Sequence, residues 1–224
     1  MDDRVFLIAG ASSGIGAATA HLAAQAGYRL VLAARSEEPL QALARQLDAI
    51  PVIADVTVYS DLEHLVNTAL DNYGHIDAVF ANAGVGFPRG FDEGDAEQAK
   101  HVVMINVYGV YATIRATSKA LRESKGHLVI TSSIAGKRAL KGSLYSATKF
   151  AVTGMAEAAR QDFNGTGVRT TLISPGMVET PGFSHDLEEM LTPEDIARTV
   201  IFALDQPPHV DINDIVVRPT AQDS

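Results

Sequence analysis

Short apolar runs alternate with amphipathic stretches along the whole chain. Six runs are rich in apolar residues, and a seventh short one follows near the end. These runs are residues 4–9, 30–33, 52–54, 76–81, 127–131, 168–173 and 212–217. A short run without polar alternation is typical of a strand that is buried on both faces of a parallel sheet.

Stretches with helical spacing separate the apolar runs. In residues 36–47, for example, Leu40, Leu43 and Leu47 form one stripe. Strands that alternate with helices in this way predict an α/β fold, a doubly wound parallel sheet of about seven strands with helices on both faces. The chain has no repeat, low-complexity tract or linker, so we expect one domain over residues 1–224.

The predicted helix at residues 96–121 is long and apolar. Its middle, residues 102–111, is apolar nearly all round, and such a helix is covered on more than one side. We therefore expect it to pack on the sheet and against a second subunit, in a homodimer or homotetramer. Residues 85–95, just before it, are rich in glycine and acidic charge and predict a solvated loop without a metal.

Charge and composition narrow the classes of partner. The 224 residues carry a formal net charge of −9, which argues against a nucleic acid or an anionic membrane surface as partner. No apolar run reaches the roughly 18 residues of a spanning helix, and the acidic start Met1-Asp2-Asp3 is unlike a secretory signal. The absence of cysteine excludes disulfides and thiolate metal sites and favours a cytoplasmic protein.

A glycine cluster follows the first apolar run. Gly10, Gly14 and Gly16 lie between that run and a predicted helix, where glycine lets the backbone approach a pyrophosphate and the helix N-terminus attracts its charge. The spacing differs from the common G-x-G-x-x-G. The position favours a dinucleotide site in a Rossmann-like fold, and the alternative is a tight turn without a ligand.

The end of the second run indicates which dinucleotide binds. The chain continues there as Ala33-Ala34-Arg35-Ser36, with no carboxylate before Glu37. A carboxylate at this place would bind the adenosine ribose of NAD, whereas arginine suits the 2′-phosphate of NADP. We expect NADP(H), with Arg35 on the phosphate and Ser13 and Ser36 adding hydrogen bonds. The alternative is that Arg35 is a surface residue at the start of a helix.

Tyr145 and Lys149 form a candidate acid–base pair. They lie four residues apart on a predicted helix that begins near residue 143, so they share one face. Tyrosine, with a pKa of about 10, is a poor proton donor near neutrality, and an ammonium group one turn away lowers that pKa. Ser133, twelve residues before Tyr145, can return to the same place as a hydrogen-bond partner for a substrate oxygen.

These motifs occur together in a defined order. The order is G-x-x-x-G-I-G at residues 10–16, Asn82-Ala83-Gly84, Asn106, Ser133, Tyr145-x-x-x-Lys149 and Pro175-Gly176. With them the chain, from about residue 4 to residue 218, resembles a short-chain dehydrogenase/reductase of the classical type. The resemblance implies hydride transfer between a nicotinamide and a carbonyl or alcohol carbon of a small molecule.

The resemblance also implies the role of each catalytic residue. Tyr145 is the proton donor in reduction and the base in oxidation. Lys149 lowers the pKa of Tyr145 and holds the nicotinamide ribose, and Ser133 hydrogen-bonds the substrate oxygen. Asn106 anchors a water that links Lys149 to solvent.

A larger set of residues is implied to surround the cofactor, with Asp55 and Val56 beside the adenine and Val178 and Thr180 at the carboxamide. The full set is Gly10, Ser12, Ser13, Gly14, Ile15, Gly16, Arg35, Ser36, Asp55, Val56, Asn82, Ala83, Gly84, Tyr145, Lys149, Pro175, Gly176, Val178 and Thr180.

Three features depart from the general family pattern. The interval from Ser133 to Tyr145 is one residue shorter than a common family spacing, so the adjacent Ser132 stays an alternative. The substrate loop near residues 181–192 is short, which favours an open site. The segment from residue 209 to residue 222 resembles the branch of NADP-dependent 3-hydroxy acid and serine dehydrogenases.

The expected function is an NADP(H)-dependent oxidoreductase that acts on a small 3-hydroxy acid, alcohol or ketone. The alternatives are a 3-oxoacyl-type or broad aldehyde/ketone reductase and, outside enzymes, an NADPH-sensing regulatory protein on the same fold. The joint presence of Ser133, Tyr145 and Lys149 counts against the sensor, which has no need of an acid. The seven histidines lack metal-ligand spacing, so we expect no metal.

Overall fold

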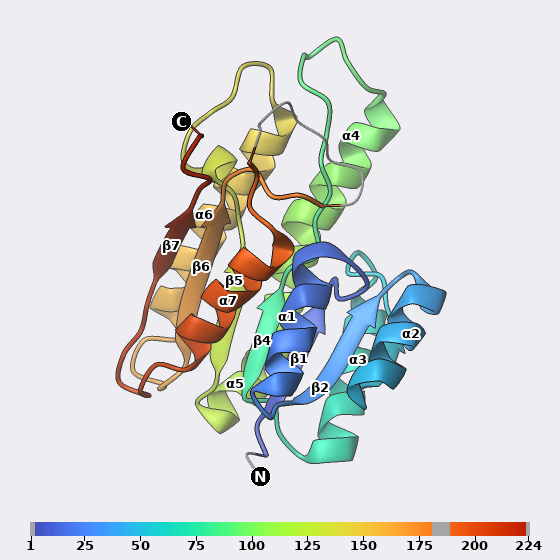
Figure 1. Ribbon diagram of the computed structural model, residues 1–224, viewed down its shortest axis with the longest axis vertical. Coiled ribbons are helices and arrows are strands. Elements are labelled where there is room, and N and C mark those ends of the chain that lie inside the picture. The colour runs from blue at the N-terminus through green and yellow to red at the C-terminus, as the bar shows by residue number, and fades with distance from the viewer. Residues whose placement is uncertain (1–2, 181–188, 223–224) are drawn as a thin grey trace.

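A seven-stranded parallel sheet runs through the part of the chain that the computed structural model describes, residues 3–180 and 189–222 (Figure 1). The strand order is β3-β2-β1-β4-β5-β6-β7. The strands are β1 (Val5–Ala9), β2 (Arg29–Ala34), β3 (Ile50–Ile53), β4 (Ala78–Ala81), β5 (His127–Thr131), β6 (Arg169–Pro175) and β7 (Asp214–Val217). The doubly wound parallel sheet that the apolar runs predicted is thus confirmed.

The central strands are buried as their sequences indicate. Every residue of β1, β4 and β5 is buried, because helices cover both faces of the sheet and leave no polar side of the strand. The chain passes from β1 outward to β3 and then returns to β4, on the other side of β1. At such a reversal, open α/β sheets bind ligands in a crevice outside the carboxyl ends of the strands, which here are the ends of β1 and β4.

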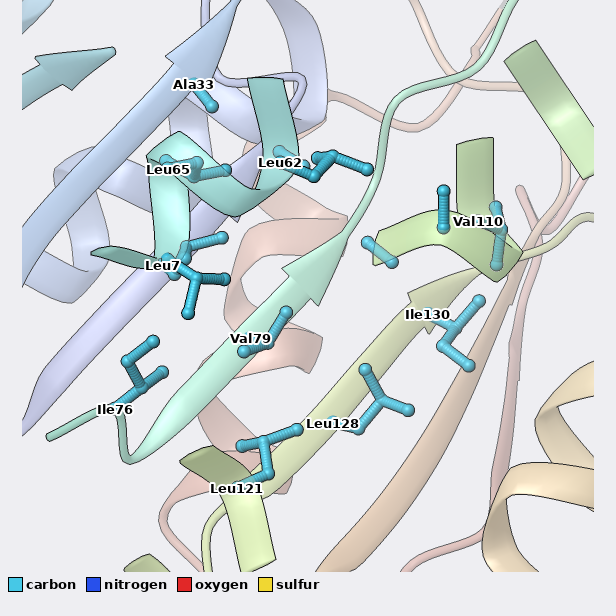
Figure 2. Close-up of a cluster of buried hydrophobic side chains, with 14 of the residues drawn as sticks. Leu7, Ala33, Leu62, Leu65, Ile76, Val79, Val110, Leu121, Leu128 and Ile130 are labelled. Atoms are coloured by element: carbon cyan, nitrogen blue, oxygen red, sulfur yellow. The ribbon is translucent and has the colours of Figure 1, made fainter. Parts of the chain in front are cut away.

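Two layers of helices enclose the sheet. One face is covered by α1 (Gly14–Gln25), α2 (Glu37–Leu47) and α7 (Pro193–Leu204), and the other by α3 (Tyr59–Tyr73), α5 (Val110–Ser124) and α6 (Leu144–Asp162). Figure 2 shows the apolar packing on the second face, where Leu62 and Leu65 of α3 and Val110 and Leu121 of α5 meet side chains of the strands.

Local signals in the sequence set the helix starts. Thr192 and Asp195 form a capping box, with Pro193 at the first position of α7. Ser143 caps α6 by accepting a hydrogen bond from the backbone N–H of Ser146. Asp95 caps α4 (Ala96–Val103) in the same way, so part of the acidic cluster in the preceding loop serves to start a helix.

The single long helix predicted at residues 96–121 is wrong in one respect. A π-helical segment, η1 (Met104–Gly109), interrupts it between α4 and α5. A π turn inserts one residue into the helical register, and such turns are frequent at functional sites. The apolar pattern of residues 102–111 cannot reveal it, because those positions are apolar on nearly every face whatever the register.

No helix within residues 3–180 and 189–222 is long and apolar enough to cross a membrane. The same residues contain no cluster of three or more His, Cys, Asp or Glu side chains arranged to hold a metal ion.

Candidate active site

The predicted site residues gather at the carboxyl edge of the sheet. They follow the ends of β1 to β6, together with the π segment above the sheet and the first turns of α6. Hydrogen bonds link several of these strand ends directly, as described below. Residues 181–188, which include most of the predicted substrate loop, lie outside the described residues.

The turn after β1 is shaped to admit an anion. Gly10 has φ +85°, and a Cβ there would lie 2.8 Å from the Cα of Ala83, while a Cβ on Gly16 would lie 2.0 Å from the Gly10 carbonyl oxygen. Both positions therefore require glycine. Ser13 precedes α1 without a side-chain capping bond, and the first turn carries no acidic residue. The N–H groups and dipole of α1 are thus available to a phosphate.

Asn82 braces this turn against the neighbouring strand ends. Its Nδ2 donates to the Gly10 carbonyl oxygen at 3.1 Å, and its Oδ1 accepts from the Thr131 hydroxyl at 2.9 Å. The ends of β1, β4 and β5 are therefore tied together by one amide. These two hydrogen bonds fix the position of residues 82–84, the bed on which a cofactor would lie.

Lys149 points into the buried side of the site. It is 3% exposed, and its Nζ donates to the Thr131 carbonyl oxygen at 3.0 Å. The same Nζ lies 5.7 Å from the centre of the Tyr145 ring. Burial lowers the pKa of Lys149 to about 8, because desolvation disfavours the charged amine.

The Tyr145 phenol differs from the sequence-based expectation. Burial raises the pKa of Tyr145, and a side-chain hydrogen bond with Ser133 opposes that rise. The predicted lowering by Lys149 is not what the structure displays, since the ammonium group donates to the Thr131 carbonyl and lies 5.7 Å from the centre of the phenol ring.

The two adjacent serines have different surroundings. Ser132 is 2% exposed, donates to the Lys149 carbonyl oxygen at 3.2 Å and bonds the Thr153 hydroxyl at 3.0 Å, so it holds β5 to α6. Ser133 bonds the Tyr145 side chain, accepts from the backbone N–H of Ala135 at 3.1 Å and faces the end of β6. The geometry favours Ser133 as the substrate partner.

Asn106 sits in the π segment and is fully buried. Its Oδ1 accepts from the Val85 N–H at 2.9 Å, and its Nδ2 donates to the Val85 carbonyl at 2.9 Å and to the Thr148 hydroxyl at 3.2 Å. Both amide hydrogens are therefore in use. This side chain holds the chain that leaves β4, beside Gly84 and Lys149.

Arg35, at the end of β2, lies near the carboxylate of Asp55. Its Nη1 lies 3.8 Å from Oδ2 of Asp55, which follows β3, and 3.4 Å from Nε2 of His101 on α4. Burial acts to raise the pKa of Asp55, but hydrogen bonds from Thr57 and the charges of Arg35 and His101 outweigh it and leave the pKa below its ordinary value.

The chain after β6 is held by the C-terminal segment. The Gly176 N–H donates to the Val217 carbonyl at 2.7 Å, and the Met177 N–H donates to Oε1 of Gln222 at 3.0 Å. A Cβ on Gly176 would lie 2.3 Å from that same oxygen. Val178 is buried and forms a bridge with Leu191, so its side chain faces the core beneath α7.

Comparisons with known proteins agree with this geometry. The model of the short chain dehydrogenase family matches residues 4–190. A protein of Staphylococcus epidermidis, named only as an uncharacterized oxidoreductase, is 36% identical over 224 residues, which are 97% of each chain.

Two solved structures illustrate the likeness in three dimensions. A serine dehydrogenase complexed with NADP+ has a TM-score of 0.93 and 27% identity over 98% of this chain and 96% of its own. A 3-ketoacyl-(acyl-carrier-protein) reductase from Brucella melitensis, complexed with NADH, has a TM-score of 0.91 and 25% identity over 97% of this chain and 98% of its own. The fold, the family match and the relatives together establish that this chain belongs to the short chain dehydrogenase family of oxidoreductases.

Proposed function

We propose that this oxidoreductase uses NADP(H) to interconvert a small hydroxyl compound, with a 3-hydroxy acid as the leading class, and the corresponding carbonyl compound. The observation that carries the proposal is the constellation of Ser133, Tyr145 and Lys149. The phenol is bonded to the serine, and the amine lies 5.7 Å from the phenol ring. An acid, a hydroxyl partner and a cation thus meet at one place beside the crevice.

These side chains have distinct roles in the reaction. The nicotinamide, when bound, supplies or accepts the hydride. Tyr145 donates its phenolic proton to the substrate oxygen in reduction and removes it in oxidation, while Ser133 orients that oxygen by a hydrogen bond. Lys149, with a pKa of about 8, carries its proton at neutral pH and places a positive charge 5.7 Å from the centre of the Tyr145 ring.

The residues present fit a dinucleotide. The glycine turn after β1 leaves room for a pyrophosphate at the uncapped start of α1. Residues 82–84 form a rigid bed beside it. Arg35, half-exposed at the end of β2, offers planar donors to a 2′-phosphate. The similar structures bind either NADP+ or NADH, so Arg35 is the residue that supports NADP(H).

Two observations support the proposed substrate class: the sequence of the C-terminal segment and the likeness to one solved structure. Residues 209–222 resemble those of 3-hydroxy acid and serine dehydrogenases, and a serine dehydrogenase is among the similar structures. Gln222 reaches back to the chain after β6, which leaves that segment beside the reacting centre. The second candidate is a 3-oxoacyl-type reductase, which the likeness to the ketoacyl reductase favours.

A direct assay separates these functions. The purified chain is incubated with NADP+ and a 3-hydroxy acid such as serine, and with NADPH and a simple ketone or a 3-oxoacyl thioester, and absorbance at the reduced nicotinamide band is followed. Turnover of the hydroxy acid supports the proposal, and faster turnover of the thioester replaces it with the second candidate. Tight NADPH binding without any turnover would instead support a sensor.

We also propose that the chain associates with itself through α5 and α6. Tyr111 of α5 and Phe150 of α6 are 47% and 45% exposed, large values for such apolar side chains. Their burial between subunits would remove this surface from water. Sedimentation at micromolar concentration is expected to give a dimer or tetramer, and a monomer would contradict the proposal.

A further inference from the structure

Two basic side chains from distant parts of the chain face each other at the adenosine end of the crevice. Nη1 of Arg35, at the end of β2, lies 3.4 Å from Nε2 of His101, on α4. Both residues are exposed, so a ligand can reach them. Figure 1 shows α4 beyond the carboxyl ends of the strands.

Arg35 alone is poorly suited to a dianion in these surroundings. The Asp55 carboxylate lies 3.8 Å from the same Nη1 and offsets part of its charge. The net charge of the chain, −9, adds a general repulsion against phosphate. A second cationic donor near Arg35 would restore a positive site, and His101 is the basic side chain in contact with it.

We propose that His101 forms, with Arg35, the recognition site for the 2′-phosphate of NADP(H), so that α4 as well as β2 sets the cofactor preference. This inference rests on the proposed use of NADP(H). Neutral His101 accepts the hydrogen bond that Arg35 donates across the 3.4 Å contact. A phosphate between the two side chains is bonded by both once His101 gains a proton, since each then offers N–H donors to the same anion.

The Asp55 carboxylate keeps its charge between pH 6 and pH 8, whereas Lys149, whose pKa is about 8, gains a proton within that range in wild type and variant alike. Asp55 has a pKa below its ordinary value and stays ionised near neutrality. On α4 itself, Glu97 and Lys100 pair with each other. On α6, which packs against α4, Tyr145 and Lys149 turn to Ser133 and Thr131. A protonated imidazole offers two N–H donors to an anion, whereas a neutral one offers a single donor.

The test measures binding of two adenosine fragments that contain no nicotinamide. Adenosine 2′,5′-bisphosphate carries the 2′-phosphate and 5′-AMP lacks it, and calorimetric titration at pH 6 and pH 8 gives the dissociation constants. His101→Gln is expected to raise the dissociation constant of the bisphosphate about fivefold at pH 6, as for loss of an exposed charge pair. At pH 8 the dissociation constant is expected to change little. Binding of 5′-AMP stays within twofold or so of wild type.

Two further variants sharpen the result. His101→Lys supplies a permanent charge, so it is expected to bind the bisphosphate tightly at both pH values. His209→Gln, in the loop between α7 and β7 at the opposite edge of the sheet, is the matched control and is expected to behave as wild type. The phosphate itself gains a proton near pH 6, and this change is common to all variants and cancels in the comparison.

The outcomes separate the two proposals. If His101→Gln binds the bisphosphate as wild type does at both pH values while Arg35→Leu binds it weakly, Arg35 acts alone and the inference about His101 is overturned, but NADP(H) use stands. If wild type binds both fragments equally, both proposals fall.

Discussion

Replacing Lys149 with methionine tests whether a charged amine is held in a desolvated site at the expense of stability. The side chain is 3% exposed, and burial lowers its pKa from 10.5 to about 8. The folded protein therefore binds this proton roughly 300-fold more weakly than the unfolded chain, a difference of about 3 kcal/mol. Methionine keeps the length of the side chain and removes the charge.

The sign of the pH dependence follows from the lowered pKa. Between about pH 8 and pH 10.5 the folded protein has lost the proton and the unfolded chain has kept it, so stability rises with pH in that window. Below pH 8 the cost of burying the charged Lys149 amine lowers the unfolding free energy in full. From pH 7 to pH 9.5 the unfolding free energy of wild type is expected to rise by about 2 kcal/mol relative to Lys149→Met.

Urea unfolding at the two pH values measures this difference. The bond that Lys149 makes to the Thr131 carbonyl is lost in the variant at every pH, so it shifts both values equally and cancels. Lys119→Met, at an exposed lysine of α5, is the matched control and is expected to follow the pH dependence of wild type. A relative change smaller than about 0.5 kcal/mol, near the error of extrapolation, would refute the reasoning.

Three further predictions concern the site. Tyr145→Phe is expected to lower kcat by about 100-fold or more, as for loss of a general acid, and to leave NADPH affinity within a few fold; near-full activity would remove Tyr145 from the mechanism. Ser133→Ala is expected to lose most activity. Ser132→Ala loses hydrogen bonds between β5 and α6 and is expected to lose mainly thermal stability. The reverse pattern would exchange the roles of the two serines. Arg35→Asp is expected to reverse the ratio of NADPH to NADH affinity, and an unchanged ratio would show that this residue does not contact the phosphate.

Much of the fold could be predicted because its signals are local. A buried parallel strand is apolar throughout, as β1 and β5 are, and turn glycines or caps mark where helices begin. The motif residues were placed correctly at the strand ends, since all strands of a parallel sheet end at the same edge. The α/β alternation predicted the parallel sheet, and the structure supplies the order of its strands.

Other features depend on contacts that the sequence pattern does not contain. The π segment around Asn106 changes the helical register without changing the apolar pattern. The amine of Lys149 is bonded to a backbone carbonyl, which any residue at position 131 would supply. His101 lies 66 residues from Arg35 along the chain, and no spacing rule links a helix residue to a strand end at that distance.

The hydrogen bonds between Asn106 and Val85 bear on how far the sequence of residues 86–95 can change. The amide accepts the N–H and donates to the carbonyl of Val85, the same reciprocal pair by which a neighbouring antiparallel strand would bind it. The cofactor bed is therefore fastened upstream of residues 86–95, and its position does not depend on them. Insertions, deletions or transplanted sequences in that stretch are therefore expected to leave residues 82–85 where they are.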